Sequence, residues 1–115
     1  NSNLSYVWML DSNVKNFDSL AECLALRNIS LTDTIVDDYI INSDGNFTMK
    51  DSGFLSSFDN VTELGIYIDI IEDVSGICEM DSLKSLSVSE GTISDQAIDQ
   101  LEKKGIKVAQ KKIDD

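Results

Sequence analysis

The chain of 115 residues contains no histidine. Histidine is the commonest general base in proteins, the base in most serine and cysteine nucleophile systems, and the usual zinc ligand. Its absence excludes the common hydrolase triads and the common zinc sites. An enzyme would have to use carboxylate or tyrosine chemistry, and no motif gathers such groups into a pocket. We therefore expect a protein that is not an enzyme and uses no metal and no cofactor.

Proline is also absent, and there are only two cysteines, Cys23 and Cys78. A chain without proline favours compact elements joined by regular connections. The cysteines are 55 positions apart (78 − 23), and each lies among apolar residues, which favours two buried thiols. A disulfide between them is the alternative, and it requires an oxidising compartment.

Basic residues are few: 9 lysines and arginines stand against 21 acidic residues, which gives a net charge of −12. Such a surface repels phosphate backbones and anionic membranes, so we expect no nucleic-acid partner. No apolar run approaches the roughly 20 residues of a membrane span, so we expect no membrane insertion. Simple solubility or a basic partner protein are the explanations left for the charge.

The chain begins at Asn1 and not at a methionine. This favours an exported protein that has lost its leader, extracytoplasmic or at the surface of a bacterium. A domain taken from a longer protein would look the same. The length and the hydrophobic content of 42% predict a single domain with its own core, spanning residues 1–115.

The first half of the chain has short β patterns separated by polar turns. Residues 4–10 (LSYVWML) predict a strand, and Ile29–Leu31 predicts another. Between them, Asp18 is a plausible cap for a helix with Leu20 and Leu24 on one face.

Residues 39–49 predict a β-hairpin, with Asp44-Gly45 as the turn. A calcium loop is the alternative for this stretch. With Gly45 at the sixth position of an EF-hand loop, Ile40 fails the first position, and Asp51 takes the place of the glutamate at the twelfth. The hairpin therefore accounts for the sequence better. Residues 51–58 predict one or two helical turns.

The second half contains a repeat. Val61, Leu64 and Ile66 recur as Leu83, Leu86 and Val88, with a difference of 22 in residue number each time (83 − 61, 86 − 64, 88 − 66). A third, partial copy, Ile106 and Val108, follows Leu86 and Val88 with a difference of 20 (106 − 86, 108 − 88). Two helical stretches connect the copies: a short one over residues 75–80, and a longer one over residues 94–104, capped by Ser94 and ended by Gly105.

The L-x-x-L-x-L pattern at this spacing resembles the leucine-rich repeat family. The resemblance is clearest over residues 55–108; residues 1–54 form an atypical or capping part, and 55–115 the repeat-like part. The asparagine that the family carries after each strand is absent from both copies. The resemblance implies an α/β solenoid, with a parallel sheet on one face and helices or turns on the other. One strand and its return cannot cover their own apolar face, so successive units must stack and share a core.

The outward strand positions are the candidate binding residues, because side chains alternate across a sheet. Where Leu64 and Ile66 point to the core, their neighbours point to the open face, and the resemblance implies that such positions contact a ligand. The predicted site comprises Glu63, Gly65, Tyr67, Ser85, Ser87 and Lys107. The alternative is a solvated sheet face with no ligand. The exposed end strand at residues 106–108 is a further candidate, for pairing with a second copy.

Two other groups of residues are weaker candidates for function. The acidic pairs Asp37–Asp38, Glu72–Asp73 and Asp114–Asp115 could act as acid and base, but solvated faces explain them better. Tyr6 and Trp8 could form a binding patch, but the sequence favours a buried or edge-covering strand.

The sequence therefore predicts a non-catalytic protein-interaction or scaffold module of leucine-rich-repeat type. The alternative is an acidic inhibitor, of the immunity-protein kind, that binds a basic enzyme.

Overall fold

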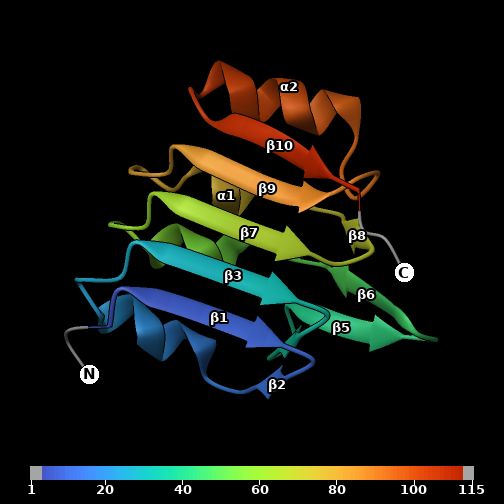
Figure 1. Cartoon of the computed structure of the whole chain (residues 1–115), viewed down its shortest axis with the longest axis horizontal. Coiled ribbons are helices and arrows are strands. Elements are labelled where there is room, and N and C mark those ends of the chain that lie inside the picture. The colour runs from blue at the N-terminus through green and yellow to red at the C-terminus, as the bar shows by residue number, and fades with distance from the viewer. Residues whose placement is uncertain (1–3, 113–115) are drawn as a thin grey trace.

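The structure, a computed structural model, describes residues 4–112. Its main feature is a sheet of five parallel strands that lie side by side in the order of the chain (Figure 1). The strands are β1 (Tyr6–Leu10), β3 (Asn28–Thr32), β7 (Glu63–Tyr67), β9 (Ser85–Ser89) and β10 (Lys107–Lys111). The protein is thus of the α/β class.

Three of the four pairs of neighbouring strands in this sheet have the same spacing in residue number. Tyr6 lies opposite Asn28, Glu63 opposite Ser85, and Ser85 opposite Lys107. The residue numbers differ by 22 in each of these pairs (28 − 6, 85 − 63, 107 − 85). A pass of the chain across the molecule and back therefore has the same length, 22 residues, between β1 and β3, between β7 and β9, and between β9 and β10. The repeat found in the second half of the sequence is a property of the first half as well, since β1 and β3 pair at the same spacing.

The step from β3 to β7 is longer, because Asn28 lies opposite Glu63, a difference of 35 in residue number (63 − 28). The additional length, 13 positions (35 − 22), accommodates an antiparallel hairpin, β5 (Ile40–Ser43) and β6 (Asn46–Met49). Its turn is Asp44-Gly45, both with positive φ (54° and 86°), as a tight hairpin requires. The predicted hairpin is confirmed.

The hairpin belongs to a second, smaller sheet at the carboxyl ends of the main strands, in the order β2-β4-β5-β6-β8. The other three strands of this sheet are very short: β2 (Asn13–Val14), β4 (Ile35–Val36) and β8 (Ile70–Ile71). Each follows a strand of the main sheet and turns the chain away from it.

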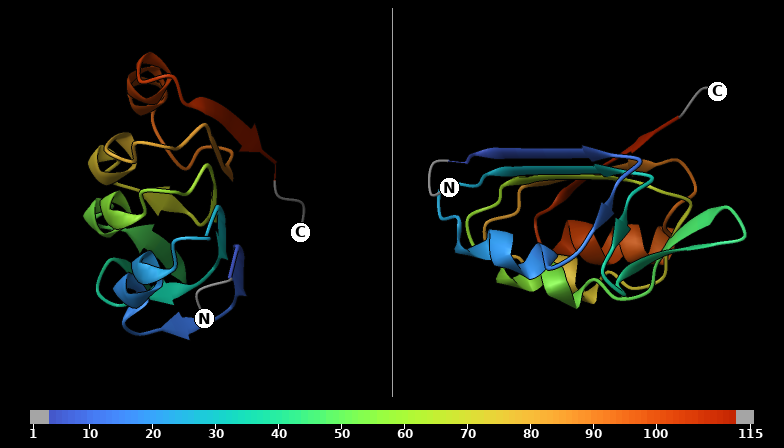
Figure 2. Two further views of the ribbon diagram at one scale, coloured as in Figure 1. Left: turned by 90° about the vertical axis from the view of Figure 1, so that its left-hand side faces the viewer. Right: turned by 90° about the horizontal axis from the view of Figure 1, so that it is seen from below.

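Short helices cover one face of the main sheet and leave the other face open (Figure 2). They are the 3-10 helices η1 (Phe17–Glu22) and η2 (Gly53–Ser57), and the α-helices α1 (Ser75–Cys78) and α2 (Asp95–Lys103). Helix α2 begins and ends as predicted: the Ser94 side chain accepts a hydrogen bond from the Ala97 N–H (3.1 Å), and Gly105 follows with φ +88°.

One continuous core lies between the sheet and the helices. The inward positions of the three central strands are almost fully buried: Ile29, Leu31, Leu64, Ile66, Leu86 and Val88. Cys78 is also buried, as predicted, and carries a free thiol. Cys23 is only half-buried, with its Sγ 3.2 Å from the Leu4 carbonyl oxygen.

Two expectations from the sequence are corrected. Val108 lies opposite Leu86, so the last copy also follows at a spacing of 22 (108 − 86) and not of 20. Ile106 is buried, but it precedes the strand, and its N–H donates a hydrogen bond to the Leu101 carbonyl (3.2 Å).

The helix expected after Asp18 is the 3-10 helix η1, which ends at Glu22, and Leu24 beyond it is 69% exposed.

Aspartate carboxylates tie successive passes of the chain together. Asp37 accepts hydrogen bonds from the N–H groups of Asn16 (2.7 Å) and Phe17 (3.1 Å) in the preceding pass. Asp69 accepts one from the N–H of Phe47 (2.8 Å). Turns and helix starts leave such N–H groups without a backbone partner, so these carboxylates have a structural role.

Asp73 makes the third connection of this kind. Its carboxylate accepts from the Ser52 N–H (3.2 Å), the Ser52 hydroxyl (3.4 Å) and the Ser75 N–H (3.1 Å). Partial burial tends to raise the pKa of Asp73, but the hydrogen bonds from Ser75 and Ser52 outweigh it and lower the pKa below its ordinary value.

Helix α1 packs against η2 at a point where only glycine fits. The Gly76 N–H donates to the Ser52 hydroxyl (2.9 Å). A Cβ on Gly76 would lie 1.9 Å from the Ser52 carbonyl oxygen, which belongs to the backbone and cannot move aside alone.

We predict that Gly76→Ala destabilises the protein by about 3 kcal/mol or more, because the two passes must separate to admit one methyl group. Chemical denaturation measures this. Gly53→Ala is the matched control: its Cβ would meet only the Asp51 carboxylate at 3.0 Å, which can rotate away, so we expect a loss within about 1 kcal/mol. Equal losses in the two variants would contradict the close-approach argument.

We predict that Asp73→Asn lowers the free energy of unfolding by about 1 kcal/mol at neutral pH, because an amide accepts these hydrogen bonds less well than a carboxylate. The folded-state pKa is lowered, so the contribution of Asp73 is fully present above the unfolded value near 3.8 and is lost as the pH falls through the folded value. Urea titrations at several pH values should therefore show the difference between wild type and variant shrinking below about pH 4. The exposed Asp81, substituted by Asn, should show no such trend.

Candidate functional site

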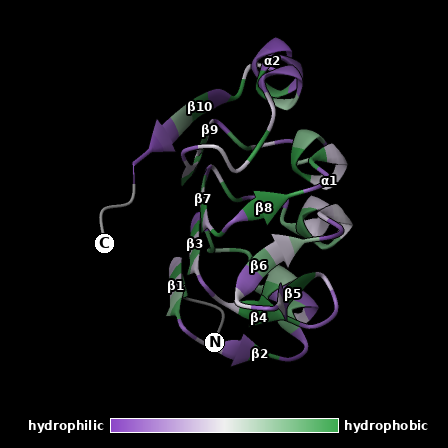
Figure 3. Ribbon diagram, turned by 90° about the vertical axis from the view of Figure 1, so that its right-hand side faces the viewer, coloured by the Kyte–Doolittle hydropathy of each residue, from purple (hydrophilic) through white to green (hydrophobic). Residues whose placement is uncertain are grey.

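The predicted site residues do come together on the open face of the main sheet. Glu63, Ser85 and Lys107 lie opposite one another on adjacent strands, and Gly65 lies opposite Ser87. Tyr67 is on the same side as Gly65, two positions further along β7. Figures 2 and 3 show this face as a concave surface in which β1 and β10 stand forward on either side of β7.

Tyr67 does not project freely from the face. Its hydroxyl donates a hydrogen bond to the Ser87 hydroxyl oxygen on the next strand (2.8 Å). The ring lies against Gly65, where a Cβ would come within 3.1 Å of it. The missing side chain of Gly65 thus makes room for the Tyr67 ring, and the ring is fixed before any partner arrives. Fixed aromatic rings lose little entropy on binding.

The strongest feature of the face is one that the sequence analysis gave only as the less favoured alternative. Tyr6, Trp8 and Leu10 point to the open face of β1 and are 53%, 61% and 49% exposed, whereas Val7 between them is buried. The expectation that Tyr6 and Trp8 are buried is therefore wrong, although β1 does lie at the edge of the main sheet. The residues on both sides of this strand are apolar, so no alternation in hydropathy marks which side faces the open face.

The floor of the face is made of small polar residues. Asn28, Ser30 and Thr32 line β3 next to the exposed stripe, and Ser85 and Ser87 line β9. A shallow hollow of about 180 Å³ crosses this floor, with Tyr6 at one side and Lys111 at the other. Small-molecule sites usually enclose at least about 300 Å³, so this hollow suits one inserted side chain better than a whole small ligand.

The face differs in charge from the rest of the molecule. Its outward positions carry Glu63, Lys107 and Lys111, a net charge of +1 (2 − 1). Since the whole chain has −12, all remaining residues together carry −13. The open face of the sheet therefore does not share the acidic character of the protein.

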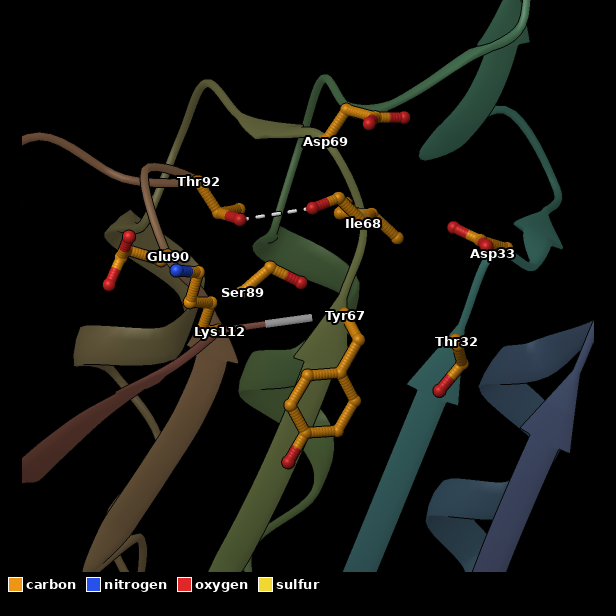
Figure 4. A pocket seen from close by; sticks show the side chains of 9 residues that line it. All are labelled: Thr32, Asp33, Tyr67, Ile68, Asp69, Ser89, Glu90, Thr92 and Lys112. Atoms are coloured by element: carbon orange, nitrogen blue, oxygen red, sulfur yellow. Dashed lines mark hydrogen bonds between the residues drawn. The ribbon is translucent and has the colours of Figure 1, made fainter. Parts of the chain in front are cut away.

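A second hollow, of about 420 Å³, lies at the carboxyl ends of the central strands (Figure 4). Asp33 and Asp69 line one side of this hollow, and Glu90 and Lys112 line the opposite side. Burial, followed by the negative charges of Asp69 and Asp11, raises the pKa of Asp33 above its ordinary value. The Thr92 hydroxyl donates its hydrogen to the Ile68 carbonyl (3.0 Å), so it has no hydrogen left to donate to a ligand.

Two of the acidic pairs each have one member whose carboxylate accepts hydrogen bonds from the backbone. Asp37 and Asp73 accept backbone hydrogen bonds, as described above, and the pair Asp114–Asp115 lies outside the described residues.

Among residues 4–112, no group of three acidic or cysteine side chains could hold a metal ion. No helix in the same range is long and apolar enough to cross a membrane.

We predict that Tyr67 and Ser87 are energetically coupled. In a double-mutant cycle with Tyr67→Phe and Ser87→Ala, we expect a coupling of about 0.5–1 kcal/mol, the usual contribution of one partly exposed hydrogen bond. Urea denaturation of the four proteins measures it. Replacing Ser87→Ala by Ser85→Ala, on the same strand and face, should reduce the coupling to nearly zero; a value that is equal in both cycles would refute the fixed-ring geometry.

A scan against protein-family models and a search of curated proteins found no match to this chain. The site is therefore interpreted from its geometry alone.

Proposed function

We propose that this protein is a short solenoid of leucine-rich-repeat type that binds another protein through its open sheet face and catalyses no reaction. The strands are parallel and in chain order, and three of the four neighbouring pairs are 22 residues apart, which supports the solenoid part of the proposal. One face covered by helices and one left open is the arrangement that such stacking produces.

The observation that carries the binding proposal is the stripe of Tyr6, Trp8 and Leu10. Three large apolar side chains, each about half or more exposed, stand in line on one strand of the open face. Single exposed apolar residues are ordinary, but a contiguous patch in a chain of net charge −12 is a recognised mark of an interaction surface. Aromatic residues are also the ones most enriched in binding surfaces.

The size of the face favours a short segment of the partner. Five strands at about 4.8 Å and five residues at about 3.3 Å give an area of about 19 Å by 17 Å, or roughly 300 Å². A standard interface buries about 800 Å² on each protein. The face alone can therefore hold one helix or one extended stretch, with a globular partner reaching beyond its rim.

The acidic hollow around Asp33 and Asp69 favours a second candidate, the inhibitor of a basic enzyme. The Asp69 carboxylate lies close enough to help raise the pKa of Asp33, so a cationic side chain from a partner would be attracted there. Binding of this kind weakens steeply as the salt concentration rises.

Pairing of a second copy of the chain with the outer edge of β10 also stays a prediction. Lys107 and Lys111 on that strand oppose it, because the two copies would bring like charges together.

We predict that proteins captured by the immobilised chain are lost when Trp8 is replaced by Ser or Tyr67 by Ala, because both rings form the open face. Capture at low and at high salt, followed by mass spectrometry, measures this. Leu24→Ser is the matched control, since Leu24 is 69% exposed but lies outside the sheet face. A partner that survives both face substitutions and is lost at high salt would reject the face in favour of the acidic hollow.

A further inference from the structure

We infer that the partner contributes a segment that crosses the strands of the open face, with a large apolar side chain over β1 and a carboxylate over β10. This inference rests on the proposed function and specifies the chemistry of the partner. The two sides of the face differ in chemistry. The β1 side is apolar and favours an apolar side chain, and the β10 side is basic and favours a carboxylate.

The β1 side is apolar without interruption. Tyr6, Trp8 and Leu10 present their side chains to solvent, and the neighbouring positions on β3 are Asn28, Ser30 and Thr32, which are too small to cover them. Covering such a stripe removes a large apolar surface from water, so this side supplies most of the affinity.

The β10 side is basic. Lys107 and Lys111 stand on the open face with only Ala109 between them on that side, and all three are exposed. The ion pairs of the described residues are Lys50–Glu72 and Lys103–Asp99, so neither lysine of the face is neutralised by a carboxylate of its own chain. A partner carboxylate would meet two cations on an otherwise acidic protein.

The centre of the face limits how much negative charge the partner can carry. Glu63 is exposed on β7, between the two sides, and would repel a second carboxylate placed there. The remaining −13 of the molecule would likewise repel a polyanion such as a nucleic acid. The hollow of about 180 Å³ beside Glu63 instead admits one neutral side chain.

The width of the sheet sets the spacing within the partner. Four strand spacings separate β1 from β10, which is about 19 Å. An extended segment covers this distance in about six residues, at about 3.3 Å each. A helix covers it in about thirteen, at about 1.5 Å each. The apolar residue and the carboxylate should therefore recur at one of these two separations.

The test is selection of a random sixteen-residue peptide library, displayed on phage, against the immobilised full chain. We expect enriched peptides to combine an aromatic or aliphatic residue with Asp or Glu at a separation of about six or thirteen. The best peptide, labelled and followed by fluorescence anisotropy, should bind about ten-fold more weakly to the double variant Lys107→Glu, Lys111→Glu, since two attractive contacts become repulsive. Selection against this variant should favour Lys and Arg instead.

The double variant Lys103→Glu, Lys104→Glu is the matched control. It changes the net charge by the same amount, but at the C-terminal end of α2, away from the open face. It should therefore leave both the selected sequences and the affinity of the best peptide unchanged. If the peptides lose binding with Trp8→Ser or Tyr67→Ala but show no preference for acidic residues, the inference is overturned while the proposed function stands. If binding is indifferent to every face substitution, both are overturned.

Discussion

The structure depends on contacts between neighbouring passes of the chain, because no pass can satisfy its strand hydrogen bonds or bury its apolar side chains alone. Each strand of the main sheet has partners only on adjacent passes, and each core side chain is covered by the helix side and by the strands next to it. Polar groups also depend on the neighbouring pass. The carboxylates of Asp37, Asp69 and Asp73 accept hydrogen bonds from backbone N–H groups of the preceding pass, so some of the acidic residues stabilise the fold itself.

This dependence explains which features the sequence predicts well. The hairpin at Asp44-Gly45 and the helix from Ser94 to Gly105 follow from local signals, a turn dipeptide and a pair of caps, and both are present. The constant spacing is visible between residues 61–66 and 83–88 because apolar residues mark both passes. In the first half the same spacing is hidden, since Tyr6 to Leu10 is apolar on both sides of the strand and the hairpin lengthens the next pass.

The errors have a common physical origin. Hydrophobicity alone aligns Ile106 and Val108 with the earlier copies, but the position opposite Val88 is Gln110, because an end strand has no further neighbour to cover its inner side. A covered strand was expected for Tyr6 and Trp8 because aromatic residues in a strand usually are covered. The side of the sheet decides the exposure of Tyr6 and Trp8, whereas the position at the end of the sheet decides that of Gln110, which is on the inner side and still exposed. For the six face residues, alternation along each strand is sufficient, although it cannot reveal that Tyr67 lies down over Gly65.

The hairpin between β3 and β7 shows where such a molecule can change during evolution. It makes one pass longer than the others, yet the strands on either side keep their register, with Ile29 opposite Leu64 and Leu31 opposite Ile66. All the added chain lies at the carboxyl-end corner, in the small second sheet, and none reaches the open face. Insertions and deletions at this corner can therefore accumulate in descendants without altering the strands that form the concave surface. Lineages that share this face could differ widely in length.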